Sequence, residues 1–207
     1  MPPKHLAFAI LYLAVFAYSG DNTITYGGQT YKTAKIGEQV WLAENLNYEA
    51  EGSVCYKNNP DNCAKYGRLY NWYTAMMACP EGWHLPSNAE WDKLYRFVDG
   101  DTGTKSPYKS ETAGKYLKAK SGWNKDGNGT DDYGFSALPG GDYSHGNFSY
   151  VGSAGYWWSP SKKYSTVAYY RFMGYSGSAD WSSTGSADWS RSSNNKSRLF
   201  SVRCIQD

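Results

Sequence analysis

The sequence predicts an α+β fold with an antiparallel sheet. Strand-like segments lie toward both ends of the chain and amphipathic helical segments lie between them, so strands and helices do not alternate. In the last strand candidate, residues 199–205, every second side chain can face a core. The 207 residues include 20 Tyr and 9 Trp, which are enough aromatic side chains to build that core in one domain.

The composition excludes several classes of protein. Only 19% of the residues are charged, and the pattern fits neither an integral membrane protein, nor a coiled coil, nor a disordered chain. Lys and Arg are scattered and the net charge is +2, so we expect no nucleic-acid partner.

The first 19 residues have the features of a signal peptide. Lys4 supplies positive charge, residues 6–17 form an apolar run too short to span a bilayer, and residues 17–19 have the small-x-small form of a cleavage site. We therefore expect a signal peptide over residues 1–19 and a single domain over residues 20–207. The expected location is secreted or at the cell surface, without a membrane span.

The four cysteines of an exported chain predict two disulfides. Three pairings are open. We favour a local Cys55–Cys63 bond around a short polar loop and a long-range Cys79–Cys204 bond. A metal site is disfavoured, because the spacings do not match zinc motifs and no histidine lies near them in the sequence.

The helices and strands are expected in the following order. Residues 29–46 predict a β-hairpin that turns at residues 37–38. Residues 68–78 predict a helix that Pro80 ends. Its apolar stripe consists of Leu69, Trp72, Tyr73, Met76 and Met77.

A second helix begins at a capping box formed by Ser87 and Glu90 and ends at Asp99-Gly100. Its buried stripe is expected to contain Trp91, Leu94, Tyr95 and Val98. A shorter helix follows over residues 111–119. The remaining strand candidates cover residues 148–151, 156–159, 166–175 and 199–205.

The segment Gly-Ser-Ala-Asp-Trp-Ser occurs at residues 177–182 and again at residues 185–190. One interpretation is a duplicated surface loop without a role. The other is a ligand loop, in which an exposed Trp stacks on a sugar face and the neighbouring Asp binds its hydroxyls. Asp180, Trp181, Asp188 and Trp189 are the ligand-binding candidates.

Common catalytic motifs are absent from the sequence: there is no nucleophile elbow, no His-Glu-x-x-His and no phosphate-binding glycine loop. His84 lies between apolar residues and is expected to be structural. A carboxylate pair drawn from Glu81, Asp126, Asp131 and Asp132 remains open, but nothing positions these residues. We expect a protein that is not an enzyme.

Residues 126–132 concentrate oxygen donors around glycines, as calcium loops do, and the metal-ligand candidates are Asp126, Asn128 and Asp131. The segment departs from the EF-hand pattern, because Asp131 replaces the loop glycine and Ala137 stands where a Glu is required. The alternative is a polar turn without a metal. No cofactor beyond this calcium ion is expected.

Six segments together resemble the Fibrobacter succinogenes major paralogous domain, a family of exported bacterial domains of uncharacterised function. The resemblance covers residues 27–207. Its motifs are QVWLAENL at 39–46, CAKYGRLY at 63–70, CPEGWHLPS at 79–87 with EW at 90–91, GTDDYGFSALPGG at 129–141, GYWWS at 155–159 and SVRC at 201–204.

Residues 82–91 are also similar to the start of the second helix in C-type-lectin-like and formylglycine-generating-enzyme-like domains. This resemblance implies a C-type-lectin-like fold with two main helices, long loops and a disulfide from the first helix to the last strand, which Cys79 and Cys204 fit. The Glu-Pro-Asn and Trp-Asn-Asp triplets of calcium-dependent sugar sites are absent.

The function expected from these features is a non-catalytic, exported surface or binding module. Its partner would be a polysaccharide or another component of the cell surface or cell wall. Two alternatives are open: an enzyme, either a carboxylate-dependent hydrolase or another catalyst of lectin-like fold, and a structural cell-surface protein.

Overall fold

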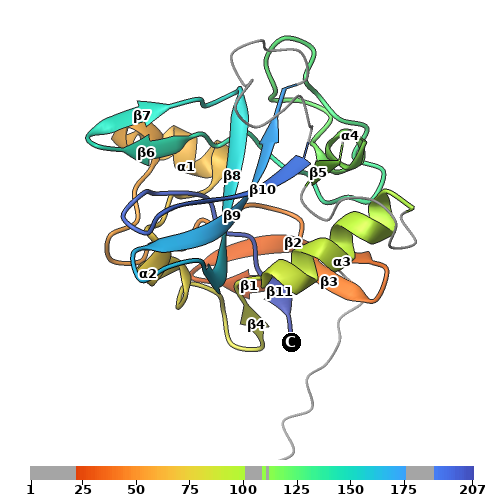
Figure 1. The fold of residues 1–207 in the computed structure, drawn as a ribbon, viewed down its shortest axis with the longest axis horizontal. Helices are drawn as coiled ribbons and strands as arrows, with labels where there is room; N and C mark the ends of the chain where they lie inside the picture. Colours follow the sequence, from red (N-terminus) through yellow and green to blue (C-terminus); the bar gives the residue numbers. More distant parts are fainter. Residues whose placement is uncertain (1–21, 101–108, 111, 176–188) are drawn as a thin grey trace, which may run out of the picture.

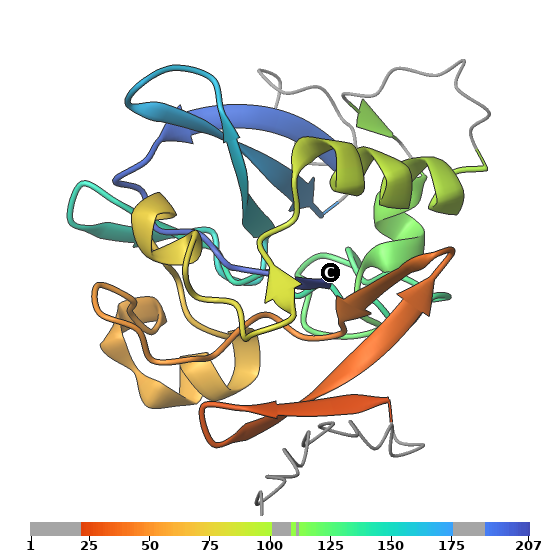
Figure 2. The same ribbon diagram turned by 90° about the horizontal axis from the view of Figure 1, so that it is seen from below.

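The computed structural model describes residues 22–100, 109–110, 112–175 and 189–207 (Figure 1). These residues form a mixed α+β structure whose strands pair almost entirely antiparallel, as the sequence predicts. A five-stranded sheet has the order β1-β2-β3-β11-β4, and a four-stranded sheet has the order β5-β10-β9-β8. Figure 2 shows β1 to β3, in red to orange, on one side of the molecule and β8 to β10 on another.

The first sheet joins both ends of the described chain. Its strands are β1 (Thr23–Tyr26), β2 (Gln29–Ile36), β3 (Gln39–Leu42), β4 (Trp83–His84) and β11 (Ile205–Gln206). The predicted hairpin of residues 29–46 is therefore β2 and β3, turning at Gly37, whose φ of 61° suits a glycine. Ile205 of β11 pairs with Trp41 on one side and with His84 on the other.

The second sheet contains β5 (Lys109–Ser110), β8 (Ala154–Lys162), β9 (Val167–Gly174) and β10 (Trp189–Asn195), and β6 (Asp142–Ser144) and β7 (Asn147–Ser149) form a separate hairpin. The predicted strand over residues 199–205 is mostly wrong. Leu199, Phe200 and Ser201 instead make isolated bridges to three different segments, and only Ile205 enters a strand.

The longest helix, α3 (Asn88–Val98), matches the prediction closely. The Ser87 hydroxyl accepts the amide of Glu90 and the Glu90 carboxylate accepts the amide of Ser87, which is the predicted capping box. Its four predicted stripe residues are buried. Trp91 contacts Trp41 of β3 and Trp189 of β10, with ring centroids 4.8 and 5.5 Å apart, so α3 packs against both sheets.

The helix predicted over residues 68–78 is largely wrong. Only α2 (Trp72–Ala75) forms there, because Leu69 and Tyr70 are extended and bridge Val54 and Phe200. The other short helices are η1 (Tyr56–Asn58), α1 (Pro60–Tyr66) and α4 (Ala113–Leu117). Three of the five expected stripe residues are exposed rather than buried: Tyr73, Met76 and Met77.

Two disulfides connect the described elements. Cys55 is bonded to Cys63, which ties the residue before η1 to α1, and Cys79 is bonded to Cys204, which ties the segment after α2 to the segment before β11. These are the two favoured pairings. Because such bonds persist in oxidising compartments, they indicate an extracytoplasmic protein.

Candidate functional site

Of the four ligand-binding candidates in the duplicated segment, the structure describes only Trp189. Trp189 begins β10, has only 1% of its surface exposed and packs on Trp91, so the expectation that it is free to meet a sugar is wrong. The reason is that Trp189 pairs with Ser110 in a sheet and faces the core. The other three candidates, Asp180, Trp181 and Asp188, lie outside the described residues.

The candidate calcium loop uses two of its three side chains locally. The Asn128 Oδ1 accepts the backbone amide of Trp123 at 3.0 Å. The carboxylate of Asp131 accepts the amide and the hydroxyl of Ser136 at 2.7 and 2.6 Å. Asp126 is exposed at a turn. Such bonds are typical of polar turns, and the described part of the chain contains no group of three His, Cys, Asp or Glu placed to hold a metal.

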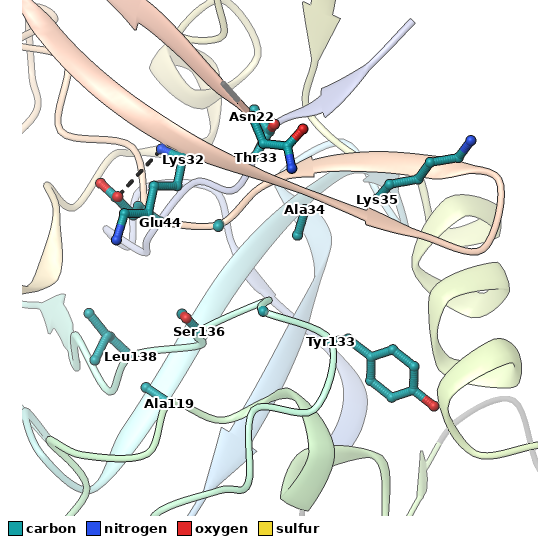
Figure 3. Close-up of a pocket in the computed structure, with 12 residues that line it drawn as sticks. Asn22, Lys32, Thr33, Ala34, Lys35, Glu44, Ala119, Tyr133, Ser136 and Leu138 are labelled. Atoms are coloured by element: carbon teal, nitrogen blue, oxygen red, sulfur yellow. Dashed lines mark hydrogen bonds between the residues drawn. The ribbon is translucent and has the colours of Figure 1, made fainter. Parts of the chain in front are cut away.

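The candidate site is a groove of about 520 Å³ between β2 and residues 133–138 (Figure 3). We call it the β2 groove. In Figure 3 the strand runs along one side, and Ser136, Leu138 and Ala119 lie on the opposite side. The groove is lined by Asn22, Lys32, Thr33, Ala34, Lys35, Ala43, Glu44, Ala119, Tyr133, Gly134, Ser136 and Leu138.

One wall of the β2 groove is made by the strand and the residues that follow its partner β3. Lys32 is exposed on β2, and the amide of Ala43 bonds to the carbonyl of Lys32 at 2.8 Å, which brings Glu44 alongside. The Glu44 carboxylate lies 3.4 Å from the amide nitrogen of Lys32. The side chains of a lysine and a glutamate thus both line this end of the groove.

The opposite wall is held in place by Arg203, whose side chain is completely buried. Its guanidinium donates to the carbonyls of Leu42 and Phe135 and to the Oδ1 of Asn45. Arg203 therefore joins the end of β3 to the loop on the far side of the groove. Burial lowers the pKa of Arg203 to about 9, while Glu44 and Asp131 favour its charged form.

At the other end of the β2 groove, the lining residue Tyr133 contacts a second aromatic ring that lies beyond the groove. Tyr133 meets Phe97 of α3 edge-on, with centroids 5.8 Å apart. Phe97 is half exposed and lies over the turn at Gly37, where an added Cβ would come 3.0 Å from the ring. We call Tyr133 and Phe97 the aromatic pair. Figure 3 shows the Tyr133 ring directed toward α3.

None of these groove residues was among the sequence candidates. A signal that could have pointed to Phe97 is its position, because it is an aromatic residue of α3 outside the buried stripe that begins at Trp91. Residues 133–138 lie within a family motif, but nothing in the sequence placed them opposite β2. The groove combines ring faces, hydroxyls, an ammonium and a carboxylate, a set suited to binding a polar ligand with apolar faces.

A second hollow of about 640 Å³ lies beside α2 and includes Tyr73, Met77, Glu51 and Asn71. The side chains of Tyr73 and Met77 are 59% and 81% exposed. Its exposed surface is therefore more apolar than that of the β2 groove, and it offers a comparison site for experiments on binding.

Comparison with known proteins identifies one match. A family model described as the Fibrobacter succinogenes major domain matches residues 34–206. No curated protein and no solved structure matches the chain. Among the described residues, no helix has the length and apolar character needed to cross a membrane.

Proposed function

We propose that this chain, which belongs to the Fibrobacter succinogenes major domain family, is an exported, non-catalytic module that binds a polysaccharide or cell-wall glycan in the β2 groove. The family prediction is confirmed, and the family itself has no assigned function. Export is supported by the two disulfides and by the predicted signal peptide.

The observation that carries the proposal is the arrangement of side chains along the β2 groove. Tyr133 and the neighbouring Phe97 offer partly exposed rings at one end, and Lys32 and Glu44 offer charged hydrogen-bonding groups at the other. A sugar ring has apolar C–H faces that stack on aromatic rings and hydroxyls that bond to ammonium and carboxylate groups. An open groove also admits an internal segment of a polymer.

Because hydrogen bonds hold both walls in place, ligand binding should cost little conformational entropy. Arg203 hydrogen-bonds to both walls, and Asp131 holds Ser136 in the loop wall. A site that is already arranged before the ligand arrives loses less conformational entropy on binding. This supports a recognition role for the groove.

We also propose a C-type-lectin-like fold. Its support is the sheet that joins β1 to β3 with β11, and the Cys79–Cys204 bond that anchors the segment preceding β11. This proposal concerns the architecture alone, because one fold hosts many functions.

The binding proposal is tested by affinity electrophoresis and pull-down on a panel of soluble and insoluble plant and bacterial polysaccharides. The informative variants are Tyr133→Ala and Glu44→Gln. We expect binding of the retained polymer to weaken about tenfold in each, because one stacking or one hydrogen-bonding contact is lost. Melting curves of each variant establish that the fold is intact.

Two exposed tyrosines provide matched controls. Tyr164→Ala changes a 65% exposed ring that does not line the groove, and Tyr73→Ala changes a ring of the hollow beside α2. Both should bind as the unmodified protein does. Loss of binding in Tyr73→Ala alone would move the site to that hollow. Retention on no polymer, or cleavage of any polymer, would overturn the proposal.

A further inference from the structure

His84 lies between two carboxylates that come from different parts of the chain. Its Nδ1 is 2.6 Å from the Oδ1 of Asp207, and its Nε2 is 2.8 Å from the Oε1 of Glu90. The side chains of His84 and Asp207 are 40% and 64% exposed. Solvent protons therefore reach the cluster directly.

The three residues come from three separate parts of the chain. His84 is the second residue of β4, Glu90 is in the first turn of α3, and Asp207 follows β11. The backbone supports this arrangement, because His84 pairs with Ile205 and the amide of Asp207 donates to the carbonyl of Gly82 at 3.0 Å. The cluster is thus a junction between the sheet and the longest helix.

Glu90 is held independently of His84. Its second carboxylate oxygen accepts the amide and the hydroxyl of Ser87, both at 2.7 Å. Its backbone carbonyl accepts the side-chain amide of Gln39 at 3.1 Å. Loss of the bond to His84 would therefore leave the start of α3 in place and release mainly the segment at Asp207.

A neutral imidazole cannot satisfy both contacts. It carries one N–H, so it donates to one carboxylate and presents a lone pair to the other, whereas the imidazolium donates to both. Two short contacts to carboxylate oxygens on opposite sides of the ring therefore match the protonated form. Among the described residues, Glu90 and Asp207 are the charged groups that act on this ring.

We propose that His84, Glu90 and Asp207 form a proton-operated clasp that fastens the segment after β11 to the start of α3 in acid and releases it as the pH rises. The Cys79–Cys204 disulfide holds Cys204, the residue before β11, in place whether or not His84 is protonated. The movement is therefore confined to the residues that follow Cys204. This inference is independent of the glycan proposal.

The direction of the pH effect follows from the surroundings of the ring. Burial lowers the pKa of His84, but the hydrogen bonds and charges of Asp207 and Glu90 together raise it above its ordinary value. A raised pKa in the folded state means that the clasp contributes its full stability below the ordinary histidine pKa of about 6.5 and loses it as the pH rises through the folded-state value.

The experiment is a titration of the purified protein, with both disulfides intact, from pH 5 to pH 9. NMR follows the imidazole of His84, and hydrogen exchange follows the protection factor of the Asp207 amide. We expect His84 to titrate above the ordinary value. The protection factor should fall over the same range, up to tenfold for each unit by which the titration midpoint is raised.

Two variants and one control make the test decisive. His84→Gln should remove the pH dependence of Asp207 protection. Asp207→Asn, a change at an exposed side chain, should lower the titration midpoint of His84. His145→Gln changes an exposed histidine that contacts Ser144. It should leave the titration midpoint of His84 and the pH dependence of Asp207 protection unchanged. A midpoint at or below the ordinary value, or the same pH dependence in His84→Gln, would overturn the clasp.

Discussion

Arg203 illustrates how one buried side chain determines the shape of a surface site. It contacts carbonyls from the end of β3 and from the loop at Phe135, and its guanidinium lies 4.4 Å from the centre of the Phe135 ring. A lysine has a single point charge and could not repeat this planar set of contacts. The two walls of the β2 groove are therefore positioned from inside the protein.

Asp142 is a buried carboxylate whose charge is only partly balanced by a neighbouring arginine. Its Oδ2 is 3.4 Å from a nitrogen of Arg198, and its Oδ1 has no hydrogen-bond partner among the described residues. Burial raises the pKa of Asp142 to about 6, although Arg198 opposes the shift. The ionised form therefore costs free energy in the folded state at neutral pH.

A prediction follows for the variant Asp142→Asn. Because the folded-state pKa is raised, the unmodified protein is stabilised by protonation below the ordinary Asp value of about 3.9 and loses this contribution as the pH rises to about 6. We expect the variant to be more stable by about 1–3 kcal/mol at pH 7.5, with the difference shrinking toward pH 4.

Chemical denaturation at several pH values checks this expectation. Asp132→Asn, at an exposed carboxylate, should shift the stability by less than about 0.5 kcal/mol at every pH. A variant at residue 142 that is equally destabilised at all pH values would show that the Arg198 contact outweighs the cost of burial.

At the scale of elements, α3 and α2 show when a local pattern suffices. The apolar stripe of α3 is long and is preceded by a capping box, and every stripe residue finds a buried partner. The stripe of α2 has similar periodicity, yet Tyr73, Met76 and Met77 face outward. The difference is tertiary, because Leu69 and Tyr70 pair with other segments and leave only one turn of helix.

The cap of α3 supplies a prediction at this scale. Ser87→Ala removes the hydroxyl that accepts the amide of Glu90, and we expect it to lower the free energy of unfolding by about 1 kcal/mol. Ser87→Thr keeps the acceptor and should cost less. Thermal or urea unfolding measures both. Equal stability of all three proteins would show that other contacts hold the start of the helix.

At the scale of the whole molecule, the two disulfides act on very different loops. Cys79 and Cys204 are 125 residues apart, whereas Cys55 and Cys63 are 8 apart. The chain-entropy model assigns about 5 kcal/mol to the long-range bond and about 2.5 kcal/mol to the local one. The long-range bond also anchors the segment that leads into β11, which lies between β3 and β4 in the first sheet.

Removing the bonds separately tests this difference. We expect the double substitution Cys79→Ala with Cys204→Ala to lower the free energy of unfolding by more than Cys55→Ala with Cys63→Ala does. Denaturant titrations of both variants give the comparison. A larger loss for the Cys55–Cys63 pair would mean that the bond between residue 55 and α1 contributes more than the length of its loop predicts.

Trp189 and Tyr133 show how far the sequence predicted the candidate site. The Asp-Trp repeat made Trp189 look like an exposed ligand residue, but its pairing with Ser110 turns it into the core beside Trp91. Tyr133 attracted no functional interpretation, although the fold brings it to Phe97 at the rim of the groove. The burial of Trp189 and the position of Tyr133 both depend on contacts with residues far away in the sequence.

The sequence by itself determined the α+β class, the family, the capped helix α3 and the two cysteine pairs that were favoured. These features rest on local periodicity, capping chemistry, cysteine spacing and shared motifs. Only the tertiary structure decided which aromatic residues are buried, where the β2 groove lies and which carboxylates face His84. Those features depend on contacts between segments far apart in the chain, such as Leu42 with Arg203 and His84 with Asp207, which no local pattern encodes.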